Sequence, residues 1–290
     1  MLKDRLKFVA DQCPLPSSPI PSLQHTKWYA EGQNLPGTYT LHSDGYTITV
    51  FKTPLVSWYR SFTVNPPSRP PDSSFITFHE WLPKFQLAKT PGWYKFGRVY
   101  TWAYARVHPN YLNDWNGQAK RHLKAFQKSG SQLRLGTKQD VMLLYTTSQV
   151  PKSLQKAMLE VLDKHLAIHP QTIDILVAEQ AGIPIGCYVA GNSDEDKISE
   201  YIIGAFHPGY AKQQPMVGLI DWWYQRSLEK GYTTNTFGHM QPPSWFPASG
   251  DGYSVFKTNF GINRLWLPIN HWRVYFSHKR PSPINPGELK

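Results

Sequence analysis

The stretch TIDILVAEQAGIPIGCYVAGNSDEDKISEYIIGAF, residues 172–206, contains three apolar runs that are separated by two turn segments. The first run, 172–178, has an alternating pattern of side chains that is typical of a strand. Gln180-Ala181-Gly182 after it favours a turn. Residues 183–190 form the second run, an acidic segment follows, and residues 198–206 form the third run. Short runs joined by turn residues are typical of neighbouring antiparallel strands. We therefore predict a three-stranded antiparallel meander over 173–206.

The chain after this meander continues with alternating helical and extended patterns. Pro215 suits the first turn of a helix, and Gly231 suits the position that follows its last turn. A second, short helix is predicted to end at Gly261. The predicted elements are a helix at 215–230, a strand at 233–237, a short helix at 253–260 and a closing hairpin of strands at 264–267 and 274–276.

Two helices are predicted before the meander, and the later one, at 152–168, includes His165 as a packing residue. The earlier helix follows Asn113 or Asp114, either of which could cap it, and Gly130 could end it. Its apolar residues recur on one face: Trp115, Ala119, Leu123 and Phe126. Its cations form a stripe on the opposite side: Lys120, Arg121, Lys124 and Lys128. The spacing leaves two interpretations of this stripe open, a solvated face and a phosphate-binding face.

Residues 1–110 differ in composition from the rest of the chain. The segments 14–22 and 65–74 are rich in Pro and Ser, which predicts loops. Aromatic and β-branched runs around these loops, at 46–51 and 99–107, predict strands. The expected domains are a reduced, β-rich N-terminal lobe over 1–110, a larger domain over 111–278 and a tail over 279–290.

The net charge of +11 is concentrated in the first half of the chain. Residues 1–150 contain 18 Lys and Arg against 8 Asp and Glu, a net +10, whereas residues 151–290 contain 13 against 12, a net +1. A basic half suggests an anionic partner, and nucleic acid, nucleotide phosphates and an anionic membrane all qualify. A basic surface that has no partner is the other interpretation.

The sequence also suggests a cellular compartment. Two cysteines, Cys13 and Cys187, can form neither a disulfide framework nor a Cys-based zinc site. Charges interrupt the N-terminus, which argues against a signal peptide. No apolar run reaches the roughly 18 residues of a membrane helix. We expect a cytoplasmic protein, either soluble or peripheral to the inner face of the membrane.

One block resembles a known family. Residues 252–261, GYSVFKTNFG, contain a Phe-Lys pair that is followed three residues later by Phe-Gly. This block resembles a hallmark of the FemABX-type peptidyltransferases, a branch of the GNAT acyltransferase superfamily. The helix with Lys120 and Arg121 resembles the helix that opens their second domain. Weaker matches lie at 175–178, 182–186, 201–205, 215–231 and 235–238.

The resemblance covers roughly residues 95–265 and implies both a fold and an activity. The fold is α/β of the α+β kind, a GNAT-like mixed and mostly antiparallel sheet with flanking helices. Family members carry two such domains, so residues 1–110 would be a reduced or divergent second GNAT-like lobe. The implied enzyme forms an amide on an amine acceptor. Aminoacyl-tRNA would be the donor, and a cell-wall precursor peptide or an amino sugar would be the acceptor.

Acyl transfer requires that an amine and an acyl carbonyl be positioned, that the oxyanion be stabilised and that a proton be removed. The resemblance places Lys257 at the site, where its ammonium could stabilise the reacting ester or the terminal ribose phosphate of a tRNA. Asp251 is the candidate proton acceptor. The predicted substrate-binding residues are Phe256 and Tyr253, which could stack on a terminal base, with Tyr201, His239, Arg121, Lys120 and Lys124. The alternative interpretation makes Phe256 and Phe260 core residues and Lys257 a solvent-exposed one.

The segment 207–214, HPGYAKQQ, bears on the cofactor. GNAT relatives bind the pyrophosphate of acyl-coenzyme A on a Gly-rich loop at this position. The single glycine here predicts no cofactor, and coenzyme A belongs to the alternative, an acyl-coenzyme A-dependent N-acyltransferase. A second alternative is a non-catalytic module that binds nucleic acid or an anionic membrane. No metal is predicted, because the eleven histidines lack ligand spacing.

Overall fold

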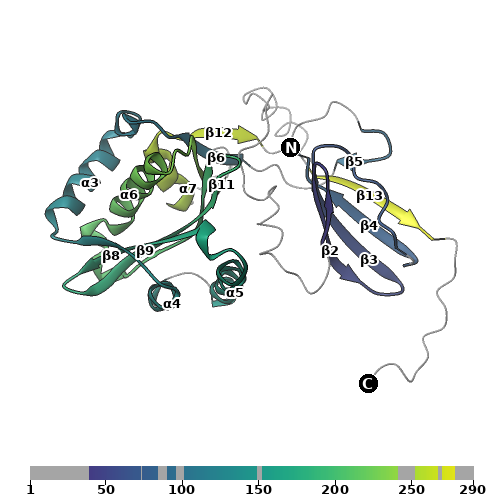
Figure 1. The fold of residues 1–290 in the computed structure, drawn as a ribbon, viewed down its shortest axis with the longest axis horizontal. Helices are drawn as coiled ribbons and strands as arrows, with labels where there is room; N and C mark the ends of the chain where they lie inside the picture. Colours follow the sequence, from purple (N-terminus) through teal and green to yellow (C-terminus); the bar gives the residue numbers. More distant parts are fainter. Residues whose placement is uncertain are drawn as a thin grey trace, which may run out of the picture. The chain divides into compact units, whose positions relative to one another are not determined.

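The computed structural model describes residues 39–72, 74–83, 90–95, 101–148, 152–240, 252–266 and 270–277. The chain divides into two compact units (Figure 1). The second unit spans Tyr100–Leu265, and the first unit contains the described residues on both sides of it in the sequence. Each unit has a β-sheet of its own.

The first unit is a six-stranded sheet in the order β1-β2-β3-β4-β13-β5. Its strands are β1 Tyr39–His42, β2 Gly45–Lys52, β3 Val56–Thr63, β4 Ile76–Trp81, β5 Tyr94–Lys95 and β13 His271–Phe276. β3 and β4 pair in parallel, and the other neighbours are antiparallel. β13 comes from the far end of the chain and occupies the place between β4 and β5. The described residues of this unit contain no helix.

The second unit contains a seven-stranded sheet in the order β12-β6-β11-β10-β9-β8-β7. Its strands are β6 Thr101–Arg106, β7 Gln132–Leu135, β8 Ile173–Gln180, β9 Ile183–Ser193, β10 Ile198–Phe206, β11 Thr234–Met240 and β12 Asn263–Trp266. β10 and β11 are parallel, whereas β7–β8, β8–β9, β9–β10 and β6–β11 are antiparallel. A parallel pair needs a crossover, and a helix between β10 and β11 provides it.

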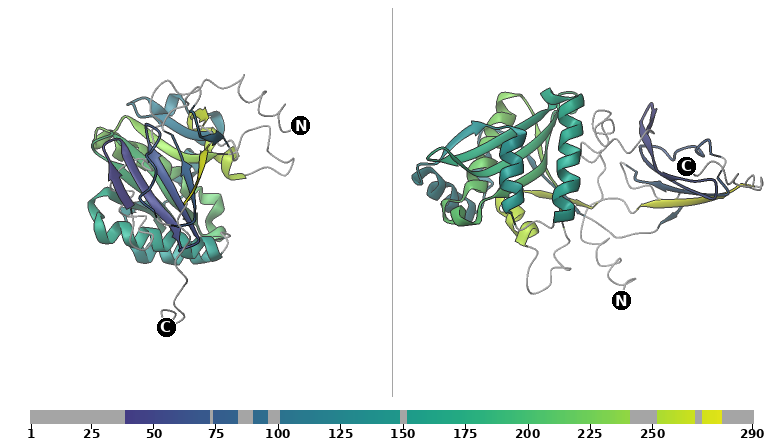
Figure 2. Two further views of the ribbon diagram at one scale, coloured as in Figure 1. Left: turned by 90° about the vertical axis from the view of Figure 1, so that its right-hand side faces the viewer. Right: turned by 90° about the horizontal axis from the view of Figure 1, so that it is seen from below.

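Helices cover both faces of this second sheet (Figures 1 and 2). They are α3 Gly117–Lys128, α4 Lys138–Thr147, α5 Lys152–Ile168, α6 Pro215–Glu229 and α7 Gly252–Lys257. Alternate residues of β9 face opposite sides, so Tyr188 packs on Trp223 of α6, while Cys187 lies on the side of Tyr145 of α4. No described helix combines the length and the apolar character of a bilayer span.

The predicted meander is confirmed, because β8, β9 and β10 lie within 173–206 and pair antiparallel. The helices predicted at 152–168 and 215–230 are α5 and α6. The short helix before Gly261 is α7 together with the 3-10 turn η6, Thr258–Phe260. His165 is fully buried, in agreement with its predicted packing role. The chain is therefore a mixed α/β protein with two mostly antiparallel sheets, as expected.

The predicted closing hairpin is wrong. β12 lies at the edge of the second sheet beside β6, whereas β13 pairs with β4 and β5 in the first sheet. The strand predicted within 99–107 forms as β6, but it pairs with β11 of the second unit and not with the N-terminal strands. Alternation of side chains predicts that a segment is extended, but it carries no information on which distant strand completes the ladder.

The start of α3 also differs from expectation. Asn116 is the N-cap, and its side-chain oxygen accepts a hydrogen bond from Ala119 N at 2.9 Å. The 3-10 turn η2, Tyr111–Asn113, occupies the region where Asn113 and Asp114 were predicted to cap. β7 and α4 had not been predicted. The helical signal of α4 is weak, because Met142 and Leu143 are exposed although they are apolar.

Cys187 is predicted to be unreactive in the folded protein. Its thiol is buried, and burial raises its pKa to about 12, so almost no thiolate exists at pH 8. In a Cys13→Ser variant, where Cys187 is the remaining cysteine, we expect no reaction with a thiol reagent until denaturant is added. Rapid labelling of the native variant, measured by mass spectrometry, would contradict this burial.

Candidate functional site

The parallel pair β10–β11 ends early, which opens a gap in the ladder at the middle of the second sheet. Pairing runs through three rungs, Ile198 with Thr234, Ser199 with Asn235 and Glu200 with Thr236. Beyond that point β10 continues only along β9, and β11 continues only along β6. Both strands change register there, β10 between 201 and 203 and β11 between 236 and 238. We call this place the divergence of β10 and β11.

Lys257 of α7 lies at this divergence. Its ammonium donates a hydrogen bond to the carbonyl oxygen of Phe237 at 2.6 Å, at the residue where β11 changes register. It also lies 5.8 Å from the ring centroid of Tyr201, at the corresponding point of β10. The residue is only 2% exposed, so the interpretation of Lys257 as a solvent-exposed residue is wrong. A buried amine held by a backbone carbonyl is a fixed polar group in a low-dielectric setting.

The residues after Lys257 explain why it is held there. Phe260 is buried, stacks on Phe237 at 5.8 Å between ring centroids and meets Trp115 edge-on at 4.9 Å. The carbonyl oxygen of Phe260 accepts a hydrogen bond from Tyr224 at 3.1 Å. These contacts attach η6 to α6, to β11 and to the residues that precede α3.

Asn259 and Gly261 complete this attachment. The Asn116 side chain donates to Asn259 Oδ1 at 2.7 Å, and Asn116 N donates to Asn259 O at 3.0 Å. Gly261 has a φ of +64° and approaches so closely that a Cβ on it would lie 2.5 Å from Cβ of Asp114. The Phe-Lys-x-x-Phe-Gly block is therefore a structural anchor, and Lys257 is the polar side chain that it places in the sheet.

The structure places some of the other predicted site residues near Lys257 and leaves others undescribed. The structure brings Tyr201 together with Lys257, as described above. Phe256 is half-buried and packs edge-on against Phe260 at 5.0 Å, so it contributes to the anchor. Asp251 lies outside the described residues, and so do the side chains of Tyr253 and His239, although their backbones belong to α7 and β11. Their predicted roles stay predictions.

The predicted basic stripe lies on the exposed side of α3. Arg121, Lys124 and Lys128 are exposed, whereas Lys120 is half-buried and donates to Asn113 O at 3.3 Å. The apolar side of α3 packs on α6 in the core. The stripe therefore forms a surface of its own, separate in the sequence and in its contacts from the buried ammonium of Lys257.

The segment before α6 is compact rather than open. It forms the 3-10 turn η4, Pro208–Gln213, in which Gly209 N donates to the ring of His207 at 3.1 Å. Tyr210 N donates to His207 O at 2.9 Å, and Gln214 N donates to Ala211 O at 3.2 Å. A phosphate site at a helix N-terminus needs amides that point at the ligand. Here several amides of the segment are already bound within it.

Glu200, which was not among the predicted site residues, also lies next to the divergence of β10 and β11. This carboxylate is buried on the last rung before the divergence. Its neighbour Ser199 points toward α6, where it accepts a hydrogen bond from Trp223 Nε1 at 2.7 Å, so Glu200 points toward the other face. An acidic residue in an apolar strand would be exposed if one face of the sheet were open. The helices on both faces bury it, and no local signal reveals that.

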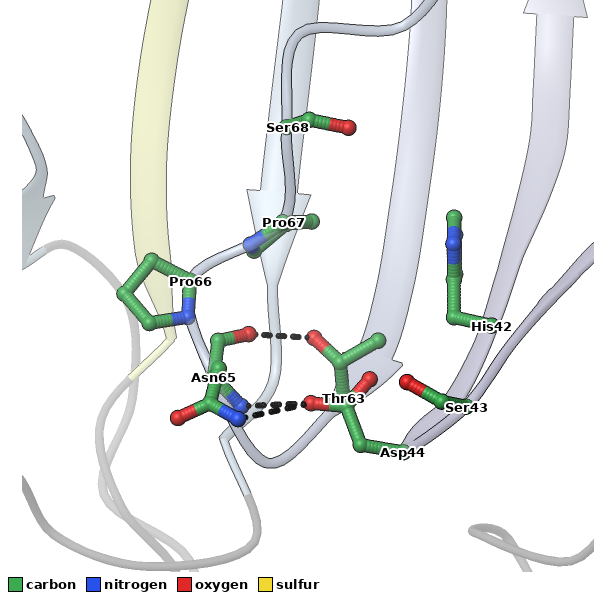
Figure 3. A pocket seen from close by; sticks show the side chains of 8 residues that line it. All are labelled: His42, Ser43, Asp44, Thr63, Asn65, Pro66, Pro67 and Ser68. Carbon is green, nitrogen blue, oxygen red and sulfur yellow. Dashed lines mark hydrogen bonds between the residues drawn. The ribbon is translucent and has the colours of Figure 1, made fainter.

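The first unit contains a polar hollow of about 300 Å³ (Figure 3). Asp44 in its wall accepts hydrogen bonds from Asn65 N at 2.9 Å and from Asn65 Nδ2 at 3.2 Å. His42, also in the wall, is hydrogen-bonded to Thr47 at 2.7 Å. The charged and titratable side chains of the wall, Asp44 and His42, are thus already paired, and none of the predicted site residues lines the hollow. Among the described residues no cluster of three or more metal-ligating side chains occurs.

Comparison of the sequence with protein-family models and with curated proteins gives no match. Solved structures are similar. A crystal structure of FemX has a TM-score of 0.68 at 10% identity, over 95% of this chain and 96% of that chain. L-PGS from Bacillus licheniformis has a TM-score of 0.52 at 10% identity, over 96% and 92% of the two chains. A conserved protein of unknown function from Bacteroides thetaiotaomicron has a TM-score of 0.54 at 6% identity, over 82% and 85%.

These similarities extend over nearly the whole chain for FemX and L-PGS, and so they include both units. Identities near 10% establish a shared fold and nothing finer. The chain therefore has a FemABX/GNAT-type fold, as the block at 252–261 had indicated from the sequence.

Proposed function

We propose that the protein is an acyltransferase that forms an amide on an amine acceptor at the divergence of β10 and β11. The observation that carries this proposal is the buried ammonium of Lys257 between Phe237 and Tyr201. Where two strands separate, their backbone groups are available to bind an acyl chain or a peptide in an extended conformation. An acyl carbonyl bound there would lie beside a fixed positive charge.

The proposed chemistry follows from this charge. Attack of the acceptor amine on the acyl carbonyl creates an oxyanion, and a preorganised cation stabilises that transition state more than the ground state. The carbonyl of Phe237 orients the ammonium, so no reorganisation is needed during the reaction. The proton lost by the amine needs an acceptor, and Asp251 stays the predicted one. The acceptor itself is proposed to be the amine of a peptide or of an amino sugar.

The proposed donor is aminoacyl-tRNA rather than acyl-coenzyme A. The occupied amides of the segment 207–214 argue against a pyrophosphate site, and the cations of α3 suit a polyanion. We expect calorimetry to detect no binding of acetyl-coenzyme A at micromolar concentration. We also expect transfer of a labelled amino acid from bulk aminoacyl-tRNA to a peptide amine. Micromolar binding of acetyl-coenzyme A with acetyl transfer would instead support the acyl-coenzyme A-dependent alternative.

The basic stripe of α3 is the proposed tRNA contact. Replacing Arg121, Lys124 and Lys128 by Gln should weaken tRNA binding about tenfold and lower the slope of log K against log salt by about 3, because each phosphate contact contributes about 1. A filter-binding titration at several salt concentrations measures both. The control replaces three cations of α5, namely Lys152, Lys156 and Lys164, by Gln. Equal losses in the two variants would show only a general charge effect.

A further inference from the structure

Part of one face of the first sheet is apolar and exposed, next to the buried cluster of Tyr46, Ile48 and Phe62 on the same face. The strands β2, β3, β4 and β13 lie side by side in this sheet (Figure 1). Phe51 pairs with Trp58, Trp58 with Phe78 and Phe78 with Val274, so these four residues form one row across the four strands. Phe276 of β13 lies two residues along on the same face. We call these five residues the aromatic face. Trp58 is half-buried, and the other four side chains are 38–60% exposed.

The opposite face of the same sheet is lined by buried polar side chains. The hydroxyl of Ser61 is hydrogen-bonded to that of Thr47 at 2.6 Å and to Nε2 of His79 at 2.7 Å. Ser57 donates to Thr77 at 3.1 Å, and all five residues are buried. A sheet with one face in water normally buries its apolar side chains and exposes its polar ones. Here the opposite face buries these polar side chains together with Tyr59 and Trp81, while the aromatic row stays exposed. A contiguous exposed patch of this kind is typical of an interaction surface.

The charge of the unit distinguishes between possible partners. The first unit consists of Met1–Ile20, Gln24–Val99 and Trp266–Lys290, and it contains 15 Lys and Arg against 7 Asp and Glu, a net +8. Two copies that met through the aromatic face would bring two such charges together, which opposes self-association. The same charge attracts an anionic lipid surface, with about 1 kcal/mol for each cation near it in simple cases.

One cation among the described residues lies on the aromatic face. Arg60 is stacked 5.3 Å from the ring of Trp58 and is also paired with Glu80 at 2.6 Å, with 37% of its side chain exposed. Lys52 follows Phe51 but points to the opposite face, where it is paired with Asp72 at 3.4 Å. Surfaces that combine aromatic side chains with a cation bind at the boundary of headgroups and acyl chains, where the rings enter the apolar side and the guanidinium remains among the headgroups.

We infer that the aromatic face docks on an anionic lipid bilayer. This would hold the first unit at a membrane surface by one face of its sheet. The inference uses no residue of the divergence, so it stands or fails independently of the proposed transferase chemistry.

Vesicle flotation of the full chain tests the inference. We expect binding to vesicles that contain phosphatidylglycerol, weaker binding when salt is raised, and none to vesicles of phosphatidylcholine alone. The double variant Phe78→Ser and Phe276→Ser should lower the partition coefficient by about tenfold or more, because two aromatic side chains no longer leave water. The matched control is Leu135→Ser with Leu143→Ser, two residues of the second unit that are 57% and 54% exposed. It should bind like the wild type.

A labelling experiment keeps the test valid if the double variant folds poorly. In a Cys13→Ser background, Phe276→Cys carries an environment-sensitive fluorophore, and buried Cys187 does not compete for the reagent. Adding phosphatidylglycerol vesicles should shift its emission to the blue, as expected for a probe that enters an apolar layer. The same label on Leu143→Cys should not respond.

Three results would overturn the inference. The first is no binding to anionic vesicles at low salt. The second is an equal loss of binding in the Leu135 and Leu143 control. The third is a dimer in light scattering that dissociates on Phe78→Ser and Phe276→Ser, since the aromatic face would then be covered by a second copy of the chain.

Discussion

Lys257→Met is expected to reduce transfer by about a hundredfold, equivalent to ~3 kcal/mol of transition-state stabilisation, as is typical of losing one preorganised charge. The variant should also be less stable by about 1–3 kcal/mol, because the buried carbonyl of Phe237 loses its donor. A surface lysine would show no such loss, so the burial of Lys257 changes the expected phenotype. Transfer of a labelled amino acid from aminoacyl-tRNA and denaturant unfolding measure the two effects.

Thr258→Val is the matched control for this variant. Thr258 is the next residue, and its hydroxyl donates to Val255 O at 2.7 Å within the same turn. The control removes a local hydrogen bond of α7 but leaves the ammonium in place, so transfer should stay close to the wild-type rate. A Lys257→Met protein that is folded and fully active would refute the proposed role. Equal losses of transfer in the two variants would mean that α7 matters only for stability.

Gly261→Ala is expected to destabilise the second unit by about 3 kcal/mol or more. A φ of +64° strains any residue with a Cβ, and the added carbon would lie 2.5 Å from Cβ and 2.9 Å from the carbonyl oxygen of Asp114. Neither atom is the end of a flexible side chain, so the backbone itself has to move. The melting temperature should fall by roughly 6–12 °C, which differential scanning calorimetry would resolve.

Gly231→Ala measures the backbone strain of a positive φ without the steric overlap of an added Cβ. Gly231 has a φ of +70°, close to that of Gly261, but no atom lies within 4 Å of the position of its Cβ. We therefore expect only the conformational cost, about 1 kcal/mol or roughly 2–4 °C. If both variants melt at the same temperature, the contact between Gly261 and Asp114 does not contribute to stability, and the anchoring role of the block at 252–261 is wrong.

Local signals predicted the central strands and the helices α5 and α6 of the second unit, but not β7 or α4. The meander β8–β9–β10 was readable because alternation and turn residues act between neighbours in sequence. The ends of α6 were marked by Pro215 and Gly231. The partners of β6 and β13 were not readable, because each pairs with a strand that is far away in sequence. Pairing of that kind is decided by tertiary packing, and a single sequence carries little signal for it.

The candidate residues were selected from the sequence, but their environment was not predictable from it. Lys257 was selected from the block that contains it, yet its burial depends on Phe260 and Gly261 docking against residues 111–116, more than a hundred positions earlier. Tyr201 was a weak candidate, and it now lies beside Lys257 because both strands change register at the same point. Glu200 was missed because its burial requires helices on both faces of the sheet.

The position of β13 has a consequence for biosynthesis. Between β4 and β5, both early in the chain, lies a strand that the ribosome makes only near the end. Until it emerges, the edge of β4 offers unpaired backbone groups, which is a risk for aggregation. The whole second unit is translated during this interval, which lasts roughly 10–35 s at usual elongation rates. The first sheet therefore gains its strand between β4 and β5 only after the second unit has been translated, and the edge of β4 can mispair during that interval.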